Sequence, residues 1–192
     1  MAQIVLASQS PRRQELLHRI GLDRFTVIHP NAEEWYPEHL TPPEIVSYIS
    51  REKAEAAQPL VEPDDIVITA DTMVFLDNQR LGKPRDEAHA LAMLTALSGR
   101  RHTVCTGITV QQGDRRLTQA ESTDVFFRTA TEQELRAYIR TGEPMDKAGA
   151  YGVQGLGSLL VERIEGDYFN VMGLPLLRLS RMLQAFGVTF FE

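Results

Sequence analysis

A run of polar and basic residues near the N-terminus has the chemistry of an anion site. The segment Ser8 to Arg13 contains two serines and two arginines around Pro11, a residue type that commonly opens a helix. Arg12 and Arg13 would then lie in the first turn, where the helix macrodipole is already positive and added cations are unfavourable. The arrangement becomes favourable if an anion binds between free backbone N–H groups and the guanidinium groups. Two solvated arginines on an exposed helix are the alternative.

Two further segments carry side chains that act in phosphate chemistry. Asp71 follows an apolar, β-branched run that we expect to be a strand ending here, and ligands of α/β proteins gather at strand ends. A carboxylate there can bind a divalent metal or take a proton from water, although it could equally cap a turn. Lys83 lies in the stiff turn Leu81 to Pro84, which suits either a fixed phosphate contact or a solvated loop lysine.

Acidic side chains could complete such a site. Glu33 and Glu34 are adjacent in a loop after a predicted strand, and neighbouring carboxylates can share a cation or simply be surface charge. Lys53 falls inside a predicted helix near Glu52 and Glu55, so an ion pair within that helix is its plain explanation.

The segment from Glu143 to Gly157 is rich in glycine and in polar side chains. Its glycines permit close backbone approach to a ligand and unusual dihedral angles. Gln154 can read the edge of a nucleobase, because its amide both donates and accepts hydrogen bonds. A purely structural turn would explain the glycines but not the tight interleaving of Lys147 and other polar residues with them.

Strands that alternate with helices along the chain indicate an α/β fold. The hydrophobic pattern predicts strands at 4–7, 25–29, 65–70 and 158–164, with an apolar run at 73–76 that could extend the third. Two long strands within 102–127 would form a hairpin at 112–114, which makes the predicted sheet mixed. Helices are expected at about 10–20, 41–57, 86–97, 131–142 and 174–186, two of them opening with a Thr-x-x-Glu capping box.

Composition limits the possible functions. The chain has 192 residues, of which 43% are hydrophobic and 24% charged, as in an ordinary globular protein. A net charge of −6 argues against binding of nucleic-acid polymers, whereas a few focused cations suffice for a small anion. The sole cysteine, Cys105, excludes an intrachain disulfide and is expected to be a small buried residue. No apolar run is long enough for a membrane helix or a signal peptide, so we expect a cytoplasmic protein.

Five segments together resemble the Maf (septum-formation inhibitor) family of nucleotide pyrophosphatases. They occur in the family's order and span nearly the whole chain: 7–13, 70–72, 82–84, 143–155 and 166–175. The resemblance implies a single domain over residues 1–192, with a long mixed β-sheet, flanking helices and two lobes around a cleft, similar to the inosine triphosphate pyrophosphatase fold. It also implies cleavage between the α- and β-phosphates of a nucleotide, a divalent cation (Mg²⁺ or Mn²⁺) and a homodimer.

The resemblance also implies roles for particular residues. Asp71 would activate water and help to bind the metal, with Glu33 or Glu34 as a further ligand. Lys53 and Lys83 would hold phosphate oxygens during catalysis. The residues expected to bind substrate are Ser8, Ser10, Arg12, Arg13, Thr72, Lys147 and Gln154.

Three of these residues bear on substrate choice. Arg12, Thr72 and Gln154 match the arginine, threonine and glutamine of the family's pyrimidine branch, whereas the branch acting on 7-methyl-GTP has an aromatic residue and two glutamates there. The resemblance therefore predicts hydrolysis of dTTP and UTP to the monophosphate and pyrophosphate. A 7-methyl-GTP pyrophosphatase and a non-catalytic nucleotide-binding regulator of cell division are the alternatives.

Overall fold

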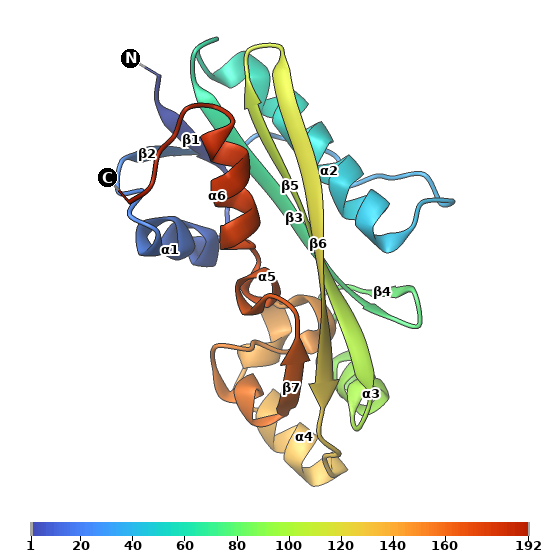
Figure 1. Ribbon diagram of the computed structural model, residues 1–192. Helices are drawn as coiled ribbons and strands as arrows, with labels where there is room; N and C mark the ends of the chain where they lie inside the picture. The colour runs from blue at the N-terminus through green and yellow to red at the C-terminus, as the bar shows by residue number, and fades with distance from the viewer. Residues whose placement is uncertain (1, 192) are drawn as a thin grey trace. The chain divides into compact units, whose positions relative to one another are not determined.

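The computed structural model describes residues 2–191 and contains a seven-stranded sheet with flanking helices (Figure 1). The strand order is β2-β1-β3-β5-β6-β7, and β4 pairs with β3. β1 is parallel to both β2 and β3, whereas β3–β4 and β6–β7 are antiparallel, so the sheet is mixed as predicted. The strands are β1 (Ile4–Ala7), β2 (Phe25–Ile28), β3 (Ile66–Leu76), β4 (Gln79–Leu81), β5 (Arg101–Gln112), β6 (Arg115–Phe127) and β7 (Val161–Glu165).

The helices begin close to the residues predicted from local signals. Capping boxes precede two of them: the Glu44 carboxylate accepts the Thr41 N–H (2.8 Å), and that of Glu134 accepts the Thr131 N–H (2.7 Å). Within residues 2–191 no helix combines the length and apolar character needed to cross a membrane. The α-helices are α1 (Pro11–Arg19), α2 (Pro42–Ala57), α3 (Glu87–Leu97), α4 (Glu132–Ile139), α5 (Tyr168–Met172) and α6 (Leu176–Gln184), and the 3-10 helices are η1 (Gln58–Leu60), η2 (Glu143–Asp146), η3 (Ala148–Ala150) and η4 (Leu156–Leu159).

Besides the 3-10 helices, one strand and one α-helix were missed by the sequence-based prediction because they are short. β4 has three residues and α5 has five, too few for a hydrophobic period to be recognised. The residues form two compact units. The first comprises the described residues up to Thr72, Thr106–Glu121 and the described residues from Gly173 onward, and the second comprises Met73–Cys105 and Ser122–Met172. β3, β5 and β6 each contribute residues to both units.

In the first unit, α2 packs on one face of the sheet while α1 and α6 lie on the other (Figure 1). α6 buries Leu176, Leu179 and Leu183, which share one helical face. On the opposite face, α2 approaches β5 so closely that a Cβ on Gly107 would lie 2.1 Å from the Val46 carbonyl oxygen. Glycine is therefore required there for backbone-to-backbone packing. This contact fixes the depth at which α2 lies on the sheet.

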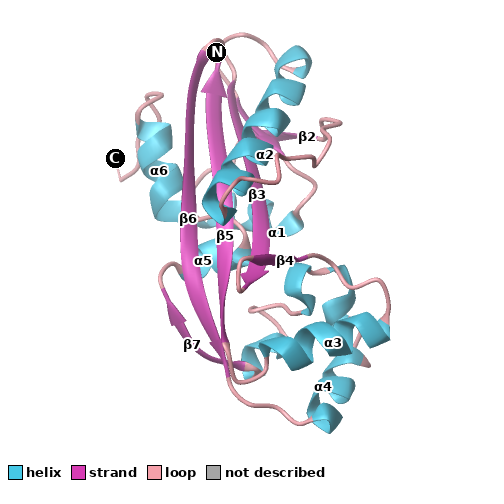
Figure 2. Ribbon diagram, turned by 90° about the vertical axis from the view of Figure 1, so that its right-hand side faces the viewer, coloured by secondary structure: helices cyan, strands magenta, loops and turns pink. Residues whose placement is uncertain are grey.

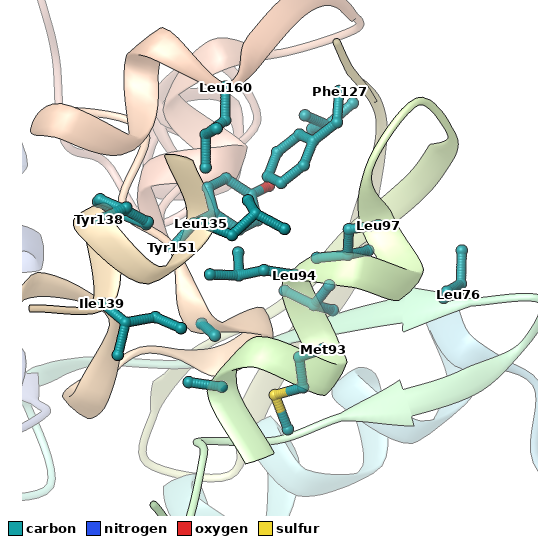
Figure 3. Packing of buried hydrophobic residues seen from close by; sticks show 14 of the residues in the cluster. Leu76, Met93, Leu94, Leu97, Phe127, Leu135, Tyr138, Ile139, Tyr151 and Leu160 are labelled. Atoms are coloured by element: carbon teal, nitrogen blue, oxygen red, sulfur yellow. The ribbon is translucent and has the colours of Figure 1, made fainter. Parts of the chain in front are cut away.

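The second unit has a core of its own, in which α3 and α4 lie side by side (Figure 2). Leu94, Leu97, Leu135, Phe127 and Tyr151 gather at its centre (Figure 3). Leu94 and Leu97 are fully buried, and burial of one such side chain stabilises a fold by about 1.5–3 kcal/mol. The buried residues of this cluster all belong to the second unit.

Candidate active site

Asp71 lies in the middle of β3, which runs without interruption from Ile66 to Leu76. Of the two possibilities left open by the sequence, the strand does not end at Asp71; the apolar run Met73 to Leu76 continues it in extended conformation. Polar groups gather around Asp71 because the neighbouring strand β1 ends before it. β1 pairs with β3 only as far as Ile68 and ends at Ala7, so Asp71 lies beyond the carboxyl end of a parallel neighbour.

Asp71 is bound by a lysine from α2. The Lys53 Nζ donates to Asp71 Oδ1 at 2.8 Å and lies 3.4 Å from Glu34 Oε1. The predicted ion pair of Lys53 with its helix neighbours is therefore wrong: the lysine turns from α2 toward the sheet and links two acidic residues distant in sequence. Of the two candidate glutamates, Glu34 is the one beside the lysine; both side chains are exposed.

One oxygen of Asp71 has no hydrogen-bond partner. Asp71 is 5% exposed, and its Oδ2 is buried. A buried polar atom without a partner is costly and is often found where a ligand or ion completes the site. Carboxylate oxygens are preferred ligands of Mg²⁺ and Mn²⁺, so Asp71 and Glu34 fit a divalent cation chemically. Within residues 2–191, no group of three or more His, Cys, Asp or Glu residues could hold a metal by itself.

Arg13 connects the start of α1 to the strand that carries Asp71. Its Nη1 donates to Ser8 Oγ (3.1 Å) and to the Ala70 carbonyl oxygen (3.0 Å). Its Nη2 donates to Thr72 Oγ1 (3.1 Å), and its Nε donates to the Gly173 carbonyl oxygen (2.9 Å). Burial lowers the pKa of Arg13, and the charge of the nearby Asp71 opposes this shift. Four protein acceptors thus fix the guanidinium beside Asp71.

These bonds explain how a cation is accommodated at a helix start. The first turn of α1 contains no acidic residue, so the charge is compensated by hydroxyl and carbonyl oxygens instead. Ser8 is buried, and its Oγ also accepts the N–H of Ser10 at 3.2 Å. Arg12, in contrast, is exposed. The two adjacent arginines therefore differ: Arg13 is held by the protein, and Arg12 faces solvent.

Thr72 is held in the same network. Its Oγ1 lies 2.8 Å from Thr106 Oγ1 and 3.3 Å from the Gly173 carbonyl oxygen. The structure therefore gathers seven of the predicted site residues in the first unit, namely Ser8, Ser10, Arg13, Glu34, Lys53, Asp71 and Thr72.

Three other predicted residues belong to the second unit. Lys83 and Gln154 are exposed, and Lys147 is half-buried. The Lys147 Nζ donates to the Glu143 carbonyl oxygen at 2.9 Å and pairs with Asp146 at 2.8 Å. The Gly82 carbonyl oxygen accepts the N–H of Gly149 at 3.1 Å, which ties the Lys83 turn to the glycine-rich segment.

Glu143 organises the glycine-rich segment, a role that the sequence did not reveal. Its carboxylate accepts the N–H groups of Leu156 and Gly157, each at 2.9 Å, and the hydroxyl of Tyr138. A Cβ on Gly155 would lie 1.8 Å from Glu143 Oε1. The glycine is therefore needed for approach to Glu143 rather than to a ligand. The spacing of the glycines was the only sequence signal for this arrangement.

Cys105 behaves as predicted. It is buried in β5, its Sγ lies 3.2 Å from Ser122 Oγ, and burial raises the pKa of the thiol. A thiol with a raised pKa is a poor nucleophile at neutral pH. The chemistry of the site therefore rests on carboxylate, ammonium and guanidinium groups.

This fold and this set of contacts define an α/β protein with a cluster of paired charged groups beyond the end of a parallel strand. Residues 3–186 match the family described as Maf-like protein, and the chain belongs to the Maf family. It is 47% identical over 191 residues to a dTTP/UTP pyrophosphatase of Bacillus pumilus, with 100% of both chains covered. It is 49% identical over 191 residues to a dTTP/UTP pyrophosphatase of Moorella thermoacetica, with 98% of this chain and 97% of the relative covered.

A solved structure supports the fold assignment. A HAM1 protein from Coxiella burnetii aligns with 96% of this chain and 100% of its own, with a TM-score of 0.50 and 15% identity. At this identity the likeness concerns the fold alone. It agrees with the fold class expected from the sequence.

Proposed function

We propose that this protein is a nucleoside triphosphate pyrophosphatase that hydrolyses dTTP and UTP to the monophosphate and pyrophosphate. The observation that carries the proposal is the buried Asp71, which is paired with Lys53 and has a second oxygen without a partner. A carboxylate in this state can accept a proton from water. The full-length similarity to relatives named dTTP/UTP pyrophosphatase supports the choice of substrates.

In the proposed reaction, the oxygen of a water molecule attacks the α-phosphorus while Asp71 takes the proton. The bond from the α-phosphorus to the bridging oxygen breaks, and pyrophosphate leaves with the bonding electron pair. Three cationic side chains of the first unit, Lys53, Arg12 and Arg13, neutralise phosphate charge. Arg13 also holds Ser8 in place, and Ser8 and Ser10 bind the triphosphate at the start of α1. Most of the rate enhancement would come from positioning and charge stabilisation, as is usual in phosphoryl chemistry.

We propose that a divalent cation, Mg²⁺ or Mn²⁺, is held by Asp71 and Glu34, with Glu33 as the alternative glutamate. When bound, such an ion would stabilise the charge that develops on the departing pyrophosphate. Lys83, as a phosphate ligand, and Lys147 and Gln154, as substrate-binding residues, keep the roles that the family resemblance implies. The homodimer and the cytoplasmic location also remain proposals.

The test is pyrophosphate release by the purified protein from a panel of dTTP, UTP, CTP and 7-methyl-GTP, with and without Mg²⁺ or Mn²⁺. We expect release from dTTP and UTP that depends on added metal. Asp71→Asn should retain nucleotide binding and lose turnover by orders of magnitude. Binding without any pyrophosphate release in the wild-type protein would instead favour the regulator, and preference for 7-methyl-GTP would favour the other branch.

A further inference from the structure

Lys53 lies between the two carboxylates that are proposed to bind metal. Its Nζ is 2.8 Å from Asp71 Oδ1 and 3.4 Å from Glu34 Oε1. The side chains of Lys53 and Asp71 are 19% and 7% exposed, so this pair is little screened by water. An ammonium group thus stands where a metal ion would contact the same two residues.

Lys53 satisfies only one of the two carboxylate oxygens of Asp71. Lys53 contacts Oδ1, whereas Oδ2 is buried and lacks a hydrogen-bond partner. The acidic groups near it among residues 2–191 do not form a three-residue metal cluster. A divalent cation in contact with both carboxylates would also be repelled by the ammonium group, because like charges a few ångströms apart beside the buried Asp71 interact strongly.

We propose that Lys53 is a resident counter-ion that keeps free metal out of the site until a triphosphate arrives. The inference rests on the proposed function. The triphosphate brings oxygen atoms that can accept hydrogen bonds from the ammonium group. They can also supply further metal ligands where the acidic groups of residues 2–191 form no three-residue cluster. Metal and nucleotide would then bind together as one complex. Lys53 would link Asp71 and Glu34 in the free protein and contact phosphate in the bound one.

The test is the binding of Mn²⁺ alone, without nucleotide, measured as loss of the free-ion electron paramagnetic resonance signal. Wild-type protein should bind Mn²⁺ weakly. Lys53→Met keeps most of the side-chain stem and removes the charge, and it should bind one Mn²⁺ per chain about tenfold or more tightly. The double variant Lys53→Met/Asp71→Asn should lose this gain. Quenching of the sole tryptophan, Trp35, which is adjacent to Glu34 in the chain, gives a second readout.

Arg116→Met is the matched control, since it removes one positive charge from the same unit. Arg116 pairs with Glu55 of α2 at 2.8 Å, and its Nε donates to Gln111 Oε1 at 2.8 Å. Its Mn²⁺ affinity should equal that of the wild type. If Lys53→Met does not fold, Lys53→Gln provides the same comparison with a polar group in place of the charge.

Three results would overturn the proposal: wild-type protein that binds Mn²⁺ as tightly as the lysine variants, a gain that persists when Asp71 is also changed, or an equal gain in Arg116→Met. None of these measurements requires turnover. Failure of the proposed function, seen as absent pyrophosphate release, is therefore distinguishable from failure of this inference.

Discussion

Gly107→Ala tests how the fold places Lys53 against Asp71. A Cβ at this position would lie 2.1 Å from the Val46 carbonyl oxygen and 2.6 Å from the Ser47 amide nitrogen. Both are backbone atoms of α2, so no rotamer change can relieve the overlap and the helix must move away from β5. Overpacked cores lose about 1–3 kcal/mol, and with backbone on both sides we expect the upper end, about 3 kcal/mol.

The same displacement should reduce activity. α2 carries Lys53, and its position is also fixed by Thr69 Oγ1, which donates to the Ser50 carbonyl oxygen at 2.6 Å, and by Ser50 Oγ, which lies 2.9 Å from Thr109 Oγ1. A shift of the helix lengthens the 2.8 Å contact of Lys53 with Asp71. Because a misplacement of about 1 Å can cost as much as 100-fold in rate, we expect turnover of dTTP to fall by about tenfold or more.

The assays are urea unfolding at 25 °C and pyrophosphate release from dTTP by the folded protein. Gly82→Ala is the control for stability, since a Cβ there meets nothing within 4 Å, and its effect should stay within about 0.5 kcal/mol. If Gly107→Ala unfolds at the wild-type urea concentration with wild-type turnover, the close packing of α2 on β5 does not hold Lys53 in place. A loss of stability with full turnover would refute only the link to activity.

Three further predictions concern other parts of the molecule. Burial lowers the pKa of His102 to about 4, below its ordinary value of 6.5, so between these pH values the unfolded chain binds more protons than the folded one. The free energy of unfolding should therefore fall by about 3 kcal/mol as the pH drops from 6.5 to 4. The urea midpoint of His102→Phe should depend less on pH over this range than that of the wild type, and equal pH dependence would contradict the prediction. Glu143→Gln weakens the acceptor of two backbone N–H groups and should lower the free energy of unfolding by about 1–3 kcal/mol. Hydrogen exchange at the Gly157 amide should become faster, and unchanged exchange would contradict the role of Glu143 in holding the glycine-rich segment. Arg13→Lys removes a guanidinium group that has four protein acceptors, and it should destabilise the protein by about 2 kcal/mol or more. Arg12 is exposed, so Arg12→Lys should change the stability by less than about 0.5 kcal/mol. Equal urea midpoints of the two variants would contradict this difference.

Local signals were sufficient for much of the fold. Pro11 at the start of α1 and the capping boxes at Thr41 and Thr131 predicted three helix starts, because a cap depends on residues only three positions apart. The mixed sheet followed from the alternation of strands and helices. The five family segments, read in order, identified the family that the comparison then confirmed.

Local signals failed where the partner of a residue is distant. Neighbouring glutamates on α2 suggested an ion pair for Lys53, yet its partners are Asp71, 18 residues away, and Glu34. An exposed pair along a helix is worth only a few tenths of a kcal/mol, so it does not compete with a buried carboxylate facing the helix. The glycines before Leu156 likewise suggested a ligand, whereas Gly155 leaves room for Glu143.

The sequence by itself determined which residues carry charge, where most helices and strands begin, and which family the chain belongs to. Only the tertiary structure decided that Arg13 is held by protein acceptors while Arg12 is exposed, and that Lys53 links Asp71 to Glu34. Caps and periodicities depend on a few adjacent residues and are therefore readable along the chain. The contacts of the site depend on how β1, β3 and α2 pack together, and such packing is set by buried residues far apart in sequence.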